Sequence, residues 1–348
     1  MKKKSLNAKK TTHSLLLRSL KNKKILDIYN QFKIVINSHT NKSKKIAVAL
    51  SGGPDSLALV YLAKCFSIEE KIEIYFFIVD HKLRKGSSKE AKKVQILLKN
   101  FDIDCQILVR KNKKPTSNIQ SIARKIRYNL IINACKKNKI NHLLLGHHID
   151  DLYENFLIRL LRGSGLKGLT SFDEISRMAN EKISILRPLI DYEKKELIYI
   201  SEKIFKFYVK DPSNENLIFQ RIRVRKLISD LKKEGFDKKK LNLTLKNLKS
   251  SSDTIDFYVK KNIISNSTHI KNKNTYILNQ KFFEQSREVI FRSLSTILRS
   301  ISKRYYPPRG KSILNIILKI HDNKFVKGTL GGCYIERINK SILITKEN

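Results

Sequence analysis

The sequence predicts an open, mostly parallel α/β sheet, followed by a helical domain and a small α+β C-terminal domain. Between Ile46 and Leu186, short runs of branched apolar residues alternate with longer segments whose apolar residues recur every three or four positions. This alternation is typical of β-α-β units. From Leu217 to about Ser302 only the helical period continues, with a polar break near residues 250–252. A short helix and a hairpin-like segment are then expected at the end of the chain.

Five buried strands are expected in the first part of the chain: Ile46–Leu50, Ile72–Val79, Cys105–Val109, Leu143–Gly146 and Ile183–Leu186. Helices are predicted between them. One begins with the capping-box pattern Ser87-x-x-Glu90, and another begins near Asn118. Open sheets of this kind bind ligands outside the carboxyl ends of their strands. That edge is therefore where a functional site is expected.

The first predicted strand ends in the loop Ser51-Gly52-Gly53-Pro54-Asp55-Ser56, and a helical pattern follows directly. The two glycines allow positive φ and a close approach by a ligand, and Pro54 suits a first helical turn. Successive N–H groups and the positive end of the helix together favour an anion. The loop lacks the lysine of a G-x-x-x-x-G-K-S/T phosphate loop. An ordinary glycine-rich strand–helix turn is the structural alternative.

A second polar cluster, His147-His148-Ile149-Asp150-Asp151-Leu152-Tyr153-Glu154, follows the fourth predicted strand. Glu154 shares a helical face with Asp150, four positions earlier, and with Asp151, three positions earlier. Carboxylates at such an edge suit Mg²⁺, which binds through one or two carboxylates and substrate phosphates. An acidic helix N-terminus favoured by the helix dipole is the alternative. Because the cluster follows a strand of the same sheet as the glycine loop, a metal site is favoured.

Two groups of arginines complete the candidate site. Arg124 and Arg127 lie on the predicted third helix, and Arg221, Arg223 and Arg225 follow the turn signal at residues 211–214. An arginine beside a phosphate can stabilise charge that develops during reaction. A solvated basic helix face is the alternative for the first group. For the second group, periodicity leaves open whether the phosphates belong to a nucleotide in the loop or to a nucleic acid.

Composition bounds the partners and the compartment. The chain has 72 Lys and Arg against 31 Asp and Glu, a formal net charge of +41. This charge favours a polyanion such as nucleic acid, with compositional bias as the alternative. The four cysteines are widely separated and form no C-x-x-C pair, so a zinc knuckle is not indicated and a reducing compartment, the cytoplasm, is expected. No apolar run reaches the ~18–20 residues that span a bilayer.

The first 45 residues hold 13 Lys or Arg and one acid, Asp27. They lack the apolar core of a secretory signal, and they are richer in Lys than a transit peptide, which remains the alternative. A solvated basic arm is expected, followed by a helix around Ile25–Ile36. The predicted divisions are residues 1–43 for the basic arm and helix, 44–215 for the catalytic domain, 216–302 for the helical region, and 303–348 for the C-terminal segment.

Taken in order, the motifs resemble the tRNA(Ile)-lysidine synthase family of the N-type ATP pyrophosphatases, the PP-loop enzymes. They are SGGPDS, VDHKLR (79–84), ARKIRY (123–128), LGHHIDDLYEN (145–155), LRGSGLKGL (161–169), RPL (187–189), DPSN with RIRVR (211–225), YYPPR (305–309) and TLGGCYIER (329–337). SGGPDS alone is typical of the whole superfamily, whereas LGHHIDD with GSGLKGL is more specific. Ile222 stands where the family usually has Asn, and Asn155 where it often has Thr, which puts the position of Arg221 and the helix start in question.

The resemblance implies a sheet of the adenine nucleotide alpha hydrolase-like, Rossmann-like type. It also implies that the C2 carbonyl oxygen of the wobble cytidine in the CAU anticodon of tRNA(Ile) is adenylated by ATP, and that free L-lysine then displaces AMP to form lysidine. The implied nucleotide-binding residues are Ser51, Gly52, Gly53, Pro54, Asp55, Ser56, His81 and Arg84. The implied ligands of Mg²⁺ are Asp55, Asp150 and Glu154. The implied catalytic residues are Asp55, Arg127, Asp150, Asp151, Glu154 and Arg221.

Other functions remain open at this point. A tRNA thiolase of the same fold usually needs a cysteine pair or a cluster held by C-x-x-C, which this sequence lacks. An amidotransferase-type pyrophosphatase requires a glutaminase domain, for which no nucleophile motif is visible. A tRNA-binding protein with an inactive ATP site is disfavoured by the intact Asp55, Asp150, Asp151 and Glu154. The resemblance implies no membrane partner and leaves a homodimer open.

Overall fold

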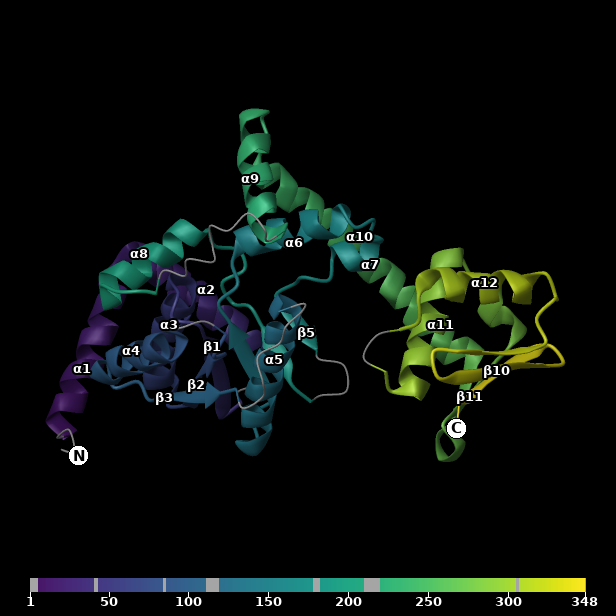
Figure 1. The fold of residues 1–348 in the computed structure, drawn as a ribbon, viewed down its shortest axis with the longest axis horizontal. Helices are drawn as coiled ribbons and strands as arrows, with labels where there is room; N and C mark the ends of the chain where they lie inside the picture. Colours follow the sequence, from purple (N-terminus) through teal and green to yellow (C-terminus); the bar gives the residue numbers. More distant parts are fainter. Residues whose placement is uncertain are drawn as a thin grey trace. The chain divides into compact units, whose positions relative to one another are not determined.

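The computed structural model describes residues 6–40, 43–83, 86–110, 119–177, 182–209, 220–304 and 307–347. These residues form two compact units, Met1–Phe236 and Asp237–Asn348 (Figure 1). The predicted boundary at residue 215 differs from the boundary between these units. The first unit continues through the helix Gln220–Lys233, because that helix packs on the helix Ile149–Leu160.

The first unit is built on a six-stranded sheet in the order β3-β2-β1-β4-β6-β5. All pairs are parallel except β5 with β6, so the predicted mostly parallel α/β sheet is confirmed. The strands are β1 (Lys45–Leu50), β2 (Glu73–Asp80), β3 (Cys105–Val109), β4 (His142–Leu145), β5 (Ile175–Arg177) and β6 (Ser184–Leu186). Each of the five expected strands is present, and β5, which has only three residues, was missed.

Alternating side chains place the helices on the two faces of this sheet. Ile46, Val48 and Leu50 of β1 point into one core, and Ala47 lies in the other. The first core contains residues of the helices α2 (Lys23–Thr40), α3 (Pro54–Glu70), α4 (Ser87–Asn100) and α8 (Lys194–Phe205). The second core contains residues of α5 (Ile119–Lys137). The unit also contains α6 (Ile149–Leu160), α7 (Leu166–Leu169) and α9 (Gln220–Lys233).

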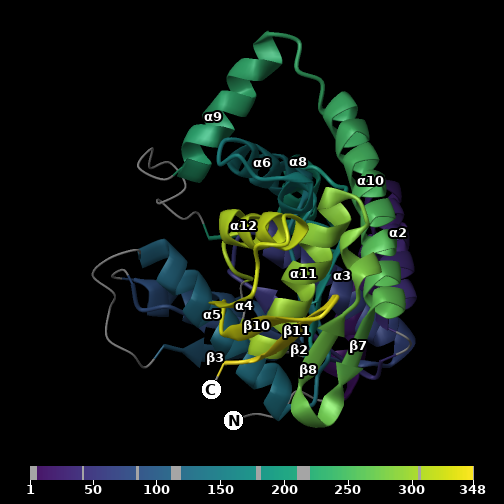
Figure 2. The same cartoon turned by 90° about the vertical axis from the view of Figure 1, so that its right-hand side faces the viewer.

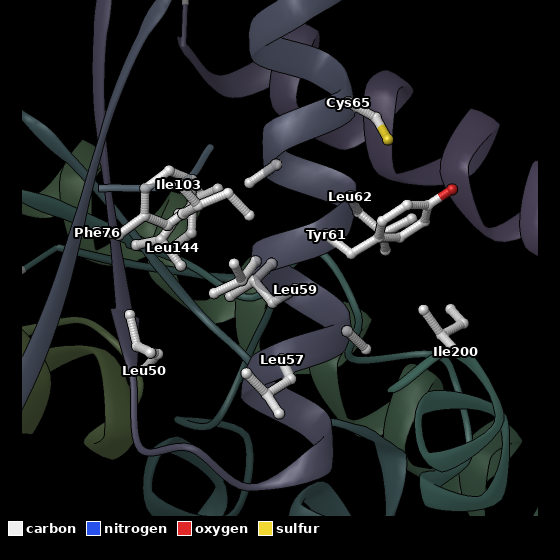
Figure 3. Packing of buried hydrophobic residues seen from close by; sticks show 14 of the residues in the cluster. Leu50, Leu57, Leu59, Tyr61, Leu62, Cys65, Phe76, Ile103, Leu144 and Ile200 are labelled. Atoms are coloured by element: carbon white, nitrogen blue, oxygen red, sulfur yellow. The ribbon is translucent and has the colours of Figure 1, made fainter. Parts of the chain in front are cut away.

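Helix α3, which begins inside the glycine loop, is the most deeply buried helix of this unit. Its residues are buried continuously from Ser56 to Ala63. In Figure 3, Leu59 lies toward Phe76 and Leu144 of the sheet, while Tyr61 points to the other side of the helix. There the Tyr61 hydroxyl donates to the Leu16 carbonyl at 3.1 Å. The loop is therefore anchored to the centre of the core.

The N-terminal segment differs from the predicted solvated arm. It forms α1 (Leu6–Arg18) and a 3₁₀ turn (Ser19–Lys21) before α2, which contains the predicted helix around Ile25–Ile36. Leu16 and Leu20 are buried in the first core. The prediction of a wholly solvated arm is wrong because apolar residues of α1 meet α3.

The predicted capping box at Ser87 is also wrong. Gly86, at φ 97°, precedes α4, and no side chain caps that helix. The Ser87 hydroxyl instead donates to Asp80 at the end of β2, at 2.8 Å. The glycine supplies the left-handed conformation that this helix start requires.

The second unit packs helices on a five-stranded antiparallel sheet in the order β7-β8-β11-β10-β9 (Figure 2). Its elements are α10 (Lys238–Asn266), β7 (Ser267–Ile270), β8 (Thr275–Leu278), α11 (Arg287–Ser302), α12 (Gly310–His321), β9 (Lys327–Leu330), β10 (Cys333–Ile338) and β11 (Ser341–Lys346), with 3₁₀ turns at Lys271–Lys273 and Gln280–Phe283. Its core joins α11, α12 and the sheet. The predicted terminal hairpin is confirmed as β10 paired with β11.

Two expectations for this region are corrected. The segment up to Ser302 is not wholly helical, because β7 and β8 interrupt it. The polar residues 250–252 do not break α10, since Ser252 is buried and its hydroxyl accepts from Arg292 Nη1 at 3.2 Å. The predicted division at 302/303 lies inside this unit.

Within the described ranges, no helix combines the length and the apolar character needed to cross a membrane.

Candidate active site

The candidate site begins with the loop Ser51–Ser56 at the carboxyl end of β1. Because β1 lies between β2 and β4, the residues that follow those two strands meet the loop at one edge of the sheet. Gly52 has φ +86°, and a Cβ there would lie 2.7 Å from Val94 Cγ2. Gly53 is the N-cap of α3 and Pro54 occupies its first turn. The loop therefore leads into the N-terminus of a 17-residue helix, a geometry suited to an anion.

The loop is held in shape by hydrogen bonds from its own side chains and its neighbours. Ser56 Oγ accepts from the Ser51 N–H at 3.2 Å and donates to the Gly53 carbonyl at 2.9 Å. The Val209 N–H donates to the Gly52 carbonyl at 2.9 Å. Gly146, after β4, packs so closely that a Cβ there would lie 2.9 Å from the Asp55 carbonyl oxygen. The N–H groups of the loop are thus preorganised by contacts made through its carbonyls.

Three of the predicted carboxylates converge on one buried imidazole. His148, which is 2% exposed, has Nε2 3.6 Å from Asp55 Oδ2 and 3.5 Å from Asp151 Oδ2, and its Nδ1 lies 3.7 Å from Asp150 Oδ2. Burial lowers the pKa of His148, but the hydrogen bond with Asp55 and the nearby carboxylate charges outweigh it, so the pKa is raised. Burial also raises the pKa of Asp151, but the charges of His148 and Arg221 leave it below its ordinary value. The structure thus brings Asp55, Asp150 and Asp151 together.

Glu154 lies in a different environment from the other acids. The residue is 2% exposed, and its carboxylate accepts from Arg221 Nε at 2.7 Å and from Arg225 Nε at 2.5 Å. Arg221 Nη2 also lies 3.4 Å from Asp151 Oδ1. Arg225 belongs to the second group of arginines expected at the candidate site, but no catalytic role was assigned to it. Its position four residues after Arg221 on one helical face is the signal that would have found it.

These contacts limit which of the acidic residues could hold a metal ion. Among the residues that the structure describes, no group of three or more His, Cys, Asp or Glu side chains is arranged to hold a metal alone. Mg²⁺ at nucleotide sites needs only one or two carboxylates, because phosphates complete its shell. Asp55 Oδ1 fits this use, since it is buried and accepts no hydrogen bond from the described part of the chain. The metal role of Glu154 remains a prediction that the two guanidinium contacts do not favour.

The end of β2, the strand beside β1, carries further polar groups at this edge of the sheet. Burial raises the pKa of Asp80, but the hydroxyls of Ser88 and Ser87 and the Lys82 N–H donate to its carboxylate and bring the pKa below its ordinary value. Arg127 Nε donates to His81 Nε2 at 3.0 Å.

Burial, and secondarily the charge of Arg127, lowers the pKa of His81 to about 4. The structure thus brings the predicted Arg127 to the predicted His81. Arg84 and the turn at residues 211–214 lie outside the described residues.

Comparison with known proteins agrees with a nucleotide-binding loop at this edge of the sheet. Residues 20–231 match the model of the PP-loop domain family. The chain is 34% identical to the tRNA(Ile)-lysidine synthase of Orientia tsutsugamushi, with 88% of this chain and 70% of that protein covered. It is also 31% identical to the enzyme of the same name from Wolbachia pipientis wMel (91% and 74% covered), and 34% identical to that from Rickettsia felis (92% and 74% covered).

One solved structure is similar to this chain in its fold but not in its sequence. The U34-tRNA thiolase NcsA from Methanococcus maripaludis superposes with a TM-score of 0.56 at 18% identity, over 65% of this chain and 78% of that chain. The sequence matches to the synthases, by contrast, cover 88–92% of this chain and so include most of the second unit as well as the PP-loop domain. Together with the loop that lacks a Walker lysine and the acidic cluster at the neighbouring strand end, these matches show that the chain belongs to the tRNA(Ile)-lysidine synthase family of PP-loop enzymes.

Proposed function

We propose that this chain, an ATP-dependent carbon–nitrogen ligase, joins lysine to carbon 2 of the wobble cytidine in the CAU anticodon of tRNA(Ile). The observation that carries the proposal is the convergence of Asp55, Asp150 and Asp151 on His148, beside a preorganised anion loop. A phosphate-binding edge that also concentrates negative charge suits a reaction between a nucleotide and an amine. The product decodes AUA rather than AUG.

The first step is adenylation. The C2 carbonyl oxygen of the cytidine attacks the α-phosphorus of ATP, and the bond to pyrophosphate breaks. The loop Ser51–Ser56 is proposed to hold the leaving pyrophosphate through its backbone N–H groups, except those of Ser51, which donates to Ser56 Oγ, and of Pro54, which has none. Asp55 and Asp150 would hold Mg²⁺, which neutralises phosphate charge when bound. Arg127 and Arg221 are proposed to face the phosphates or the substrate. The hydrogen bond with Glu154 would orient Arg221.

In the second step the lysine amine attacks carbon 2, and AMP leaves with the former carbonyl oxygen. The amine must lose protons, and the carboxylates of Asp150 and Asp151 are proposed to attract it and to accept one. The cytidine has to leave its stack to reach this edge, which costs less in an anticodon loop than in a duplex. The formal charge of +41 supports binding of the tRNA backbone, and the helical residues 216–302 are proposed to contribute to it.

The thiolase alternative is not favoured by the cysteines. All four are free and buried, and burial raises the pKa of Cys65, Cys105 and Cys135 to about 12 and that of Cys333 to about 11. Thiols with raised pKa values stay protonated at neutral pH, which does not favour a role as nucleophile or cluster ligand. Free buried thiols also support the proposed cytoplasmic location. A homodimer remains a prediction, to be checked by light scattering coupled to size-exclusion chromatography.

Incorporation of labelled lysine tests the proposal. The protein, ATP and Mg²⁺ are incubated with labelled L-lysine and tRNA(Ile) bearing CAU, and with the same tRNA carrying uridine at the wobble position as the control. Label should enter only the first tRNA, with one AMP and one pyrophosphate released per lysine. Absence of label from a folded protein that binds ATP would contradict the proposal. Incorporation of sulfur from a sulfur donor would favour the thiolase.

A further inference from the structure

Arg187 and His147 form a contact whose hydrogen-bond chemistry permits only one protonation state. Arg187 Nε lies 3.1 Å from His147 Nδ1. A guanidinium carries only donors, so Nδ1 must be the acceptor and cannot bear a proton. The ring is then neutral, and its one proton sits on Nε2. While this bond lasts, His147 cannot become an imidazolium.

Further contacts hold the Arg187 side chain in the position from which it donates to His147. Its side chain is 5% exposed, and Nη1 donates to the Asp173 carbonyl at 2.6 Å and to Ser176 Oγ at 2.8 Å. The guanidinium lies 4.7 Å from the ring centroid of Phe172, and the His147 ring packs edge-on against that same ring at 5.1 Å. One aromatic ring therefore supports both partners of the hydrogen bond.

His147 stands among the groups assigned to the reaction. It immediately precedes His148, on which three carboxylates converge, and it follows β4 at the ligand-binding edge of the sheet. The charged groups acting on it are Asp151, Arg187, Arg124 and Arg221. Burial, with the arginine charges, lowers the pKa of His147 to about 3 despite the opposing charge of Asp151. That direction agrees with the protonation state that the geometry requires.

We propose that Arg187 is a positioning residue that holds His147 as the neutral Nε2–H tautomer, so that His147 gives one hydrogen bond to an acceptor oxygen of the substrate. The inference rests on the proposed function for the identity of that substrate. It excludes His147 as the base that deprotonates the amine and leaves that task to the carboxylates. The acceptor is an oxygen either of the nucleotide phosphate or of the cytidine.

The tautomer is tested directly by nitrogen-15 NMR of histidine-labelled protein without substrate. The His147 signals, identified by their loss in His147→Gln, should show a protonated Nε2 and an unprotonated Nδ1, unchanged from pH 5 to pH 8. In Arg187→Met the ring should exchange between tautomers or titrate in that range. A titrating His147, or an Nδ1–H tautomer, in the unsubstituted protein overturns the inference, whatever the enzyme's activity proves to be.

The donor role is tested by kinetics. His147→Gln keeps an N–H near the position of Nε2, whereas His147→Asn places its amide near Nδ1, so Gln should retain at least tenfold more activity. Arg187→Met should lower kcat by roughly 10- to 100-fold, by analogy with the loss of a hydrogen-bond partner that orients a metal-ligating histidine, with little change in the KM for lysine. Equal activity of the Gln and Asn variants overturns the donor role.

Two further measurements complete the design. ATP affinity without tRNA distinguishes the two acceptors, since it should fall in His147→Asn only if the oxygen belongs to the phosphate. Arg337 is a matched control, because it too donates to several acceptors, among them the carbonyls of Ile320 and Phe325, but it lies in the second unit. Arg337→Met should leave the His147 spectrum unchanged. If Arg187→Met does not fold, the Gln and Asn comparison and the spectrum of the unsubstituted protein still decide the inference.

Discussion

Glu154 on α6 and Arg221 on α9 are joined by a hydrogen bond of 2.7 Å between the carboxylate Oε2 and the guanidinium Nε. The glutamate is buried, and Arg225 occupies its other oxygen. One acid therefore aligns two arginines from a helix that lies 67 residues or more along the chain. This pairing attaches α9 to the candidate active site and explains why the first unit extends beyond the predicted boundary.

Replacement of Glu154 by Gln should destabilise the first unit and weaken catalysis. Two guanidiniums would lose their common anion, a change that costs ~3–5 kcal/mol when the pair is wholly buried. Because both arginines are about one-third exposed, a loss of roughly 2–3 kcal/mol is expected. Urea unfolding measures it. Asp230→Asn, which breaks the exposed pair with Lys233 on the same helix, should change stability by less than ~1 kcal/mol. Equal effects of the two variants would contradict the assignment.

Asp55→Asn should abolish pyrophosphate release but leave tRNA binding nearly intact. The substitution keeps the size of the side chain and removes the charge that Mg²⁺ would require at the buried Oδ1. A decrease of at least ~10²-fold in turnover is expected, the scale of losing an electrostatic group at a reacting centre. Pyrophosphate release and filter binding of tRNA provide the two readouts. Turnover close to that of the unsubstituted enzyme would remove Asp55 from the mechanism.

Gly146→Ala should disrupt ATP binding because its Cβ would lie 2.9 Å from the Asp55 carbonyl oxygen, a rigid backbone atom. The loop would have to move, at a cost of about 1–3 kcal/mol, the range for overpacking. Gly165→Ala is the control, since Gly165 has φ −69° and no atom lies within 4 Å of the added methyl. Isothermal titration with ATP compares them. If both variants bind ATP equally well, the loop does not depend on the contact with β4.

The stability of the protein should rise with pH as His81 loses its proton in the unfolded state. Its pKa is lowered to about 4 by burial and by Arg127, so between pH 4 and 6.5 the unfolded chain binds more protons than the folded one. The contribution of His81 to stability then increases through that window and is level above it, by about 1–3 kcal/mol after allowance for partial exposure. His81→Gln, whose amide oxygen can still accept from Arg127, should lack this increment. Parallel pH curves for the two proteins would contradict the lowered pKa.

Affinity for tRNA should fall steeply with salt, because lysine and arginine contacts to phosphates release counterions. A chain with a formal net charge of +41 that makes several phosphate contacts should lose at least ~10²-fold in affinity between 50 and 200 mM salt. Filter binding at a series of salt concentrations gives the slope. A flat response would mean that the charge reflects composition rather than recognition.

The sequence by itself determined the α/β sheet, the anion loop and the acidic cluster. Each is recorded in local pattern: branched apolar runs for the strands, the glycines and Pro54 for the loop, and closely spaced carboxylates after Leu145. The shorter elements were missed or mistaken. β5 (Ile-Ser-Arg) and β7 (Ser-Thr-His-Ile) lack the apolar run that indicates β4 and β6, which are just as short, and β8 follows a segment with a helical period.

Only the tertiary structure decided which charged groups meet. Spacing placed Glu154 with Asp150 and Asp151, but the fold turns it toward Arg221 and Arg225, while Asp55 joins the two aspartates around His148. Likewise, nothing local to Arg187 reveals that its Nε donates to His147 Nδ1, because the two residues are 40 positions apart. The free energy of a charged group depends on neighbours brought together by folding, whereas helix and strand propensities depend mainly on residues close in the chain.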